Sequence, residues 1–202
     1  MRIAVTLVLT AGLICAGTVC VADSPITSTD FWRAYSDVAI VQKAADEKVM
    51  SLEFAEYLSD PGAPVDVKAA VINALSWDID GKDNAELYRY YLALRYRRTL
   101  QDLQPQALTA DEVLCLGYLT VMDDYFHPEP ALSLLEYADT RNPTSFTVAM
   151  IVALAKGQNA MEEDFKEVWR ITDRVLKNKK LKQDMRPEAV KIIVDYMKLY
   201  NE

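Results

Sequence analysis

The spacing of side chains in two stretches of the C-terminal half constrains the fold more than any other feature. Both stretches occupy positions i, i+4, i+7 and i+12, first at Ala131, Leu135, Ala138 and Pro143, and again 34 residues later at Phe165, Trp169, Thr172 and Lys177. Steps of four and three residues put side chains on one face of a helix. A unit of this length is typical of helix-turn-helix repeats that stack on their neighbours. The sequence therefore predicts stacked helical hairpins, with an ordinary helical bundle as the alternative.

The pattern resembles that of the tetratricopeptide (TPR) family in a degenerate form. Leu116-Gly117 matches the Leu-Gly pair of the family's first helix, whereas Val113 and Thr120 stand where Trp and Tyr are usual, and Val152-Ala153 replaces Leu-Gly in the second unit. The resemblance implies an all-α fold, a right-handed superhelix of antiparallel helical hairpins. It also implies a concave groove formed by the first helix of each unit, with binding residues at Asp111, Tyr118, Met122, Thr147 and Gln158.

The rest of the chain also has helical periodicity. After a short linker at residues 23–29, the pattern predicts helices in residues 31–49, 54–58, 65–77, 83–103, 109–125, 130–142 and 146–155, one that begins at Asn159, and a last one from Pro187. Asp83 with Glu86, and Thr109 with Glu112, have the spacing of a capping box. We expect roughly nine or ten helices and no strand. The last helix is amphipathic, and we expect it to cap the open end of the stack.

The first 22 residues have the pattern of a secretory signal peptide. Arg2 provides the positive start, residues 3–19 are almost wholly apolar, and Cys20-Val21-Ala22 has small residues at the two ends of a cleavage motif. An uncleaved membrane anchor and a lipoprotein acylated at Cys20 are the alternatives. Residues 23–202 are then expected to form one helical-repeat domain, exported to the periplasm or the extracellular space, with no stable membrane insertion after the signal is removed.

Composition limits the partners of this domain. Without residues 1–22 the chain has 21 basic and 30 acidic side chains, a net charge of −9. An acidic surface repels nucleic acid and anionic lipid, so neither is expected as a general partner. Cys115 is then the only cysteine, which excludes an internal disulfide, and its apolar helix predicts a buried side chain rather than a nucleophile. With few glycines and His127 as the only histidine, we expect no cofactor and no histidine-containing metal site.

Two segments have a more specific alternative reading. The Asp78 to Asp83 loop is rich in carboxylates, as calcium loops are, but Gly81 and Arg89 do not fit the EF-hand spacing, and we expect a turn. Residues 88–98 interleave tyrosines with arginines, a pattern that can bind nucleic acid or an acidic protein segment. The alternative places Leu87, Tyr91, Leu94 and Tyr90 in the core, with the arginines in solvent.

The sequence favours an exported protein-binding or scaffolding module over an enzyme. Its partner is expected to be a protein or peptide bound in the concave groove. One alternative is a hydrolase that uses carboxylates, with candidates at Asp78, Asp80, Asp123 and Asp124. Another is an acidic inhibitor or immunity-type protein that blocks a basic enzyme of the cell envelope.

Overall fold

The protein is all-α over the residues that this computed structural model describes, which are 24–161 and 164–201. Within them lie nine α-helices and three short 3-10 helices and no β-strand. The α-helices are α1 (Ala39–Glu47), α2 (Leu52–Leu58), α3 (Val65–Leu75), α4 (Asn84–Tyr96), α5 (Ala110–Asp123), α6 (Glu129–Arg141), α7 (Phe146–Ala160), α8 (Phe165–Lys177) and α9 (Pro187–Met197). The 3-10 helices are η1 (Phe31–Tyr35), η2 (Pro105–Ala107) and η3 (Lys198–Tyr200). The predicted signal peptide, residues 1–22, lies outside the described residues.

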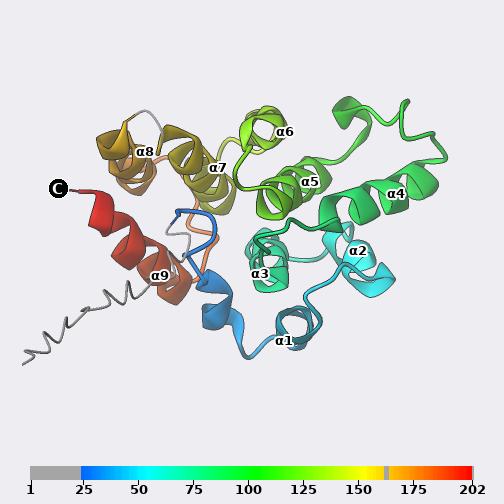
Figure 1. The fold of residues 1–202 in the computed structure, drawn as a ribbon, viewed down its shortest axis with the longest axis horizontal. Coiled ribbons are helices and arrows are strands. Elements are labelled where there is room, and N and C mark those ends of the chain that lie inside the picture. The colour runs from blue at the N-terminus through cyan, green and yellow to red at the C-terminus, as the bar shows by residue number, and fades with distance from the viewer. Residues whose placement is uncertain (1–23, 162–163, 202) are drawn as a thin grey trace, which may run out of the picture.

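The helices α5 to α8 form a row in which each packs on the next (Figure 1). Gly117 lets α5 approach α6 closely, because a Cβ at this position would lie 2.9 Å from Leu135 Cγ. The N-terminal helices lie beside α5, where α3 and α4 both contact it. In the C-terminal half, helices that are consecutive in the chain therefore pack on one another.

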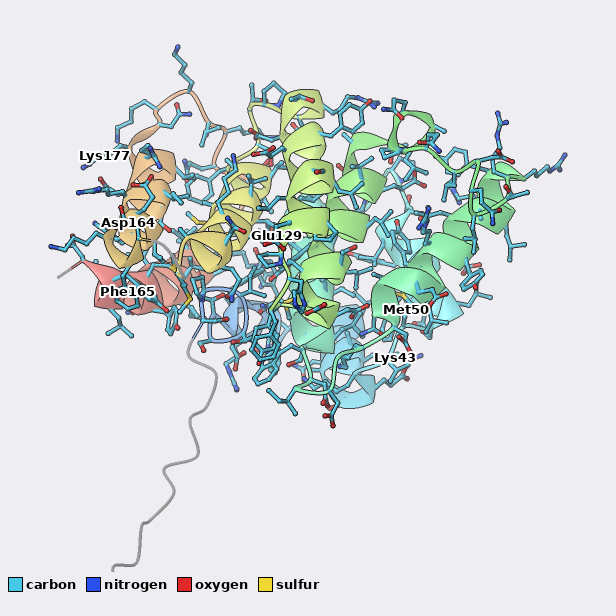
Figure 2. The ribbon with its side chains drawn as sticks, turned by 45° about the horizontal axis from the view of Figure 1, so that its top comes forward. Lys43, Met50, Glu129, Asp164, Phe165 and Lys177 are labelled. Carbon is cyan, nitrogen blue, oxygen red and sulfur yellow. The ribbon has the colours of Figure 1, made fainter. Side chains whose placement is uncertain are left out.

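The 34-residue register does not place equivalent side chains in equivalent surroundings. Ala131 is fully buried, whereas Phe165 is 55% exposed and packs its ring against Tyr200, with 4.7 Å between centroids. Figure 2 shows Phe165 at the edge of the molecule, where α8 lies beside the C-terminal helix. The third slots agree, since Ala138 and Thr172 are both fully buried, and so do the fourth, since Pro143 and Lys177 are both exposed. Both helices of the second hairpin begin 36 residues after their counterparts, at residues 110 and 146 and at residues 129 and 165.

Side-chain caps mark four of the nine α-helix starts in the described part of the chain. Thr109 and Glu112 form the predicted capping box at the start of α5, and Ser51, Ser145 and Asp164 accept backbone N–H groups at the starts of α2, α7 and α8. The predicted capping box at Asp83 is wrong, because the Asp83 side chain makes no cap hydrogen bond. The predicted helix start at Asn159 is also wrong, since α7 continues to Ala160.

Helix α4 differs from its prediction in length and in orientation. It ends at Tyr96, with Arg97 in the left-handed conformation at φ 53°, and does not reach Leu103. Its buried side is formed by Tyr88, Leu92 and Ala93. Leu87 and Leu94, predicted for the core, are 43% and 80% exposed.

The segment predicted as a linker is part of the core. Ser24, Ile26 and Thr29 are all at most 3% exposed. The Thr29 carbonyl accepts a hydrogen bond from Asn73 Nδ2 at 3.1 Å, and the Thr27 carbonyl accepts one from Trp77 Nε1 at 3.1 Å. These backbone groups thus bond to α3 and the residues after it, so the prediction of a solvated linker is wrong over the described residues 24–29.

The last helix joins the two ends of the chain instead of covering only an open end. Helix α9 packs mainly on η1, and its start lies beside the N-terminal segment (Figure 1). Just before α9, the Arg186 guanidinium donates to the Ala34 carbonyl at 3.0 Å and lies over the ring of Tyr35. The Tyr35 hydroxyl donates to Asp66 at 2.9 Å and accepts from the Arg186 N–H at 3.2 Å.

Candidate functional site

An apolar cleft of about 580 Å³ lies between α4, the segment 97–108, α5 and α6. Eight of its thirteen lining residues are apolar: Ala85, Leu100, Leu103, Pro105, Leu108, Leu116, Pro130 and Leu134. The other five are Glu86, Arg89, Gln104, Thr120 and Ser133. A cavity of this size, with an apolar lining and a few polar groups, has the character of a ligand pocket.

The outer wall of the cleft is the segment between α4 and α5. Leu103 and Leu108 are 5% and 3% exposed, so burial of these two side chains fixes the segment against the helices. Arg89 of α4 donates from Nη2 to the Leu100 carbonyl at 3.0 Å. The short helix η2 begins with Pro105, whose fixed φ favours a helical start. Together these contacts hold the cleft open on one side of α4.

The floor of the cleft is the α5–α6 contact. Leu116 and Thr120 of α5 face Pro130, Ser133 and Leu134 of α6 across it. The Thr120 hydroxyl donates to the Leu116 carbonyl at 2.8 Å, which leaves its lone pairs as acceptors. Ser133 is exposed at the rim. The floor can therefore accept hydrogen bonds at its edges while its centre remains apolar.

Three of the predicted groove residues lie in the protein core. Tyr118 and Thr147 are fully buried and Met122 is 2% exposed. The Tyr118 hydroxyl is 3.1 Å from Asn73 Nδ2, and the Thr147 hydroxyl donates to the Asp184 carbonyl at 2.9 Å. The implied groove placed these side chains in solvent, but α3 contacts Tyr118 and the segment before α9 contacts Thr147. They are not accessible to a partner in this conformation.

The other two predicted groove residues, Asp111 and Gln158, are partly exposed but lie in different places. Asp111 pairs with the buried ammonium of Lys68 at 2.7 Å. Gln158 lines a small hollow of about 50 Å³ with Phe126, Pro128, Glu129 and Asn159, and its buried Oε1 has no hydrogen-bond partner among the described residues. Neither residue lines the cleft between α4 and α6.

No family model matches this chain. Neither a curated protein nor a solved structure matches it either, so no function is transferred from a relative. None of the described helices has both the length and the apolar composition of a membrane span.

The sequence pattern does not predict the cleft, because it predicts helix through residues 97–103. The sequence does contain one indication of the cleft. Leu100, Leu103 and Leu108 lie on both sides of Pro105, and their spacing does not continue the apolar face of the helix that ends at Tyr96.

The structure brings the carboxylates proposed for a hydrolase together. Asp78, Asp80, Asp123 and Asp124 line one hollow of about 360 Å³, with Asp83 beside them. The loop begins as a turn in which the Asp80 N–H donates to Asp78 Oδ1 at 3.1 Å, and Gly81 has φ 81°. In the described part of the chain, no group of three or more His, Cys, Asp or Glu side chains is arranged to hold a metal ion.

Among the carboxylates of this hollow, Asp123 has a structural role. It is 7% exposed, and its Oδ2 accepts the Ala85 N–H at 2.6 Å, so it caps α4 from α5. Burial raises the pKa of Asp123 to about 6, against the hydrogen bond from Ala85 and the charge of Lys82, which lower it. The Lys82 ammonium donates to the carbonyls of Lys48 at 2.7 Å and Leu75 at 2.6 Å, and burial lowers its pKa.

Cys115 is buried and free, as the sequence predicted. Its Sγ is 4.0 Å from the Leu58 carbonyl, and burial raises the pKa of the thiol far above its ordinary value. A thiol that stays protonated is a poor nucleophile. Cys115 therefore acts as a small apolar core residue.

Proposed function

We propose that this protein is an exported binding module that takes an apolar segment of a protein or peptide partner into the cleft between α4 and α6. The observation that carries the proposal is the cleft itself, an apolar hollow of about 580 Å³ with polar side chains at its rim. Such a volume accommodates a bulky aliphatic or aromatic side chain together with neighbouring atoms of the partner, whose flanking backbone would meet Gln104, Thr120 and Ser133.

The rim also favours a partner that is locally polar on both sides of its apolar residue. Glu86 and Arg89 are one turn apart on α4, and both are exposed at the rim. A carboxylate and a guanidinium at neighbouring positions select a segment with charges of both signs more than one with uniform charge. The domain as a whole is acidic, which adds attraction to a basic partner surface at low salt.

We infer that the scaffold of the site is a degenerate TPR-like stack, with α5–α6 and α7–α8 as two hairpins of a right-handed superhelix. The consecutive packing of α5 to α8 and the close approach at Gly117, in the Leu-Gly pair, support this reading. The site differs from the family's concave groove because α3 packs against both α5 and α7 and fills the space beside them. Binding then moves to the opposite side of α5.

The hydrolase alternative is supported by the shared hollow of Asp78, Asp80 and Asp124 with Asp123. The Asp123 carboxylate, however, is engaged by the Ala85 N–H as a helix cap. A raised pKa that follows from burial in such a cap is a structural feature as well as a catalytic one. The cleft is therefore the better supported candidate site, and the hydrolase is the second candidate function.

A peptide-display selection against the purified protein tests the proposal. We expect enriched peptides with one bulky apolar residue, which bind with micromolar affinity. Ser133→Trp places a large ring at the exposed rim of the cleft and is expected to weaken binding at least tenfold. Thr140→Trp is the matched control, because Thr140 is exposed on the same helix and does not line the cleft. Peptides that bind both variants equally well would rule out the cleft.

Export is a separate part of the proposal and rests on the pattern of residues 1–22. Mass spectrometry of the protein recovered from the cell envelope or the medium tests it. We expect a mature chain that begins at Asp23. A chain recovered only from the cytoplasm with residues 1–22 intact would show that this part of the proposal is wrong, and the cleft would be unaffected by that result.

A further inference from the structure

Helix α4 carries an apolar stripe on its solvent side. Leu87, Tyr90 and Leu94 are 43%, 47% and 80% exposed, and Tyr91 is half-buried beside them. Steps of three and four residues place these four side chains on one face of the helix. The opposite face holds Tyr88, Leu92 and Ala93 against the core. The helix is therefore apolar on two sides, and the described residues cover one of them.

An exposed stripe of this kind indicates a contact surface. Single exposed leucines are ordinary, but neighbouring leucines and tyrosines on one helix face gain free energy when another apolar surface covers them. The stripe is not part of the cleft, because Leu87, Tyr90 and Leu94 do not line it. A contact on the stripe and a ligand in the cleft are therefore separate interactions.

The charges along α4 indicate what covers the stripe. Its start has exposed carboxylates at Asp83 and Glu86, and its end has exposed guanidiniums at Arg95, Arg97 and Arg98. A second α4 in parallel orientation would bring like charges together at both ends. An antiparallel α4 brings the acidic start of one helix beside the basic end of the other.

The apolar residues have the same symmetry as the charges. About the midpoint between Tyr90 and Tyr91, Leu87 is equivalent to Leu94, and Asp83 is equivalent to Arg98. A two-fold axis through this point pairs leucine with leucine and tyrosine with tyrosine and sets an aspartate near an arginine. Such a surface is complementary to a second copy of itself, which is the requirement for an isologous contact.

We propose that α4 is a self-association surface, on which two copies of this chain pair their α4 helices antiparallel about a two-fold axis. The stripe from Leu87 to Leu94 is about 10 Å long, so the contact is smaller than a standard protein interface. The dimer is therefore weak and forms with a dissociation constant on the order of 10–100 µM. The proposal does not depend on what the cleft binds.

Sedimentation equilibrium of the purified protein over a wide concentration range tests this inference. We expect a monomer at low micromolar concentration and a dimer at several hundred micromolar. Leu94→Glu is expected to weaken the dimer at least tenfold, whereas Leu199→Glu, at a leucine 59% exposed near the C-terminus, leaves it unchanged. A protein that stays monomeric throughout, or a dimer that Leu94→Glu does not affect, would overturn the proposal.

A charge exchange tests the antiparallel orientation. Asp83→Arg and Arg98→Asp are each expected to weaken the dimer several-fold, because each brings like charges together across the two-fold axis. The double variant restores opposite charges and is expected to recover most of the affinity. Circular dichroism confirms that each variant remains folded. A double variant weaker than both single ones excludes the antiparallel pairing, and a monomer that instead binds anionic vesicles through Leu94 assigns the stripe to a lipid surface and overturns the proposal.

Discussion

At the scale of single residues, Asp123 is a carboxylate that the fold removes from water. Its Oδ2 accepts the N–H of Ala85, which lies 38 positions earlier in the chain in the first turn of α4, and its other oxygen, Oδ1, is buried with no hydrogen-bond partner among the described residues. A charged carboxylate in such a place loses hydration that one N–H only partly replaces. The proton is therefore held more tightly in the folded chain than in the unfolded one.

This environment predicts how stability depends on pH. Because burial raises the Asp123 pKa from 3.8 to about 6, the folded state binds more protons than the unfolded state between these values. The contribution of Asp123 to the free energy of unfolding is then largest below pH 4 and is lost as the pH rises through 6. Asp123→Asn removes this dependence, so the variant gains roughly 1–2 kcal/mol on the wild type between pH 4 and pH 7. Urea unfolding at several pH values measures the difference, and parallel curves for the two proteins would contradict the prediction.

The Cys115 thiol is predicted to be unreactive in the folded protein. It is buried, and burial keeps the thiol protonated by raising its pKa. In protein that lacks residues 1–22 we expect reaction with a thiol reagent to be slowed by roughly 100-fold or more relative to the denatured chain. One thiol should react in denaturant. Rapid labelling of the native protein would mean that the helix opens locally around Cys115.

At the scale of elements, the packing of α5 on α6 holds these two helices together and also forms the floor of the cleft. Leu134 and Leu135 lie directly over Gly117, since a Cβ there would be 2.9 Å from Leu135 Cγ and 3.1 Å from Leu134 Cβ. Leu135 is fully buried, so it has little freedom to move away. The glycine is needed for close approach rather than for an unusual backbone angle.

Two glycine substitutions in helices are predicted to act in opposite directions. Gly117→Ala gains helix propensity but forces α5 and α6 apart, and we expect a loss of about 1–3 kcal/mol. Gly157→Ala is the control, because its Cβ would meet Val168 Cγ1 at 3.4 Å and two other atoms at 3.5 Å, which are ordinary contacts. It should stabilise the protein by about 0.5–1 kcal/mol. Urea midpoints of both variants check this, and an equally stable Gly117→Ala would show that the helices adjust freely.

At the scale of the whole molecule, the contact between the two ends of the chain distinguishes this fold from an open stack of hairpins. The Tyr35 hydroxyl bonds to Asp66 in α3 and to the Arg186 N–H before α9. Three parts of the chain thus meet at one buried oxygen. Below the row from α5 to α8 in Figure 1, η1 contacts both α3 and α9.

The contribution of this contact to the free energy of unfolding can be measured by removing one atom, the hydroxyl oxygen of Tyr35. Tyr35→Phe removes the shared hydroxyl and leaves Asp66 and the Arg186 N–H without their partner, so we expect a loss of about 1–2 kcal/mol. Tyr137→Phe is the matched control, because its hydroxyl only accepts a bond from Arg141 on the same helix. It should change stability by less than about 0.5 kcal/mol. Equal urea midpoints for the two variants would show that the closure adds little to the stability of the fold.

The sequence by itself determined the helical class, most helix positions, the Thr109–Glu112 capping box and the buried state of Cys115. These features depend on residues within one or two helical turns of each other, so a local pattern contains the necessary information. The tertiary structure alone decided which faces are covered. Tyr118 is buried by Asn73, Leu94 faces solvent, and residues 24–29 lie in the core. Such contacts join residues as far apart as Tyr35 and Arg186, 151 positions along the chain, and no spacing pattern specifies a partner at that distance.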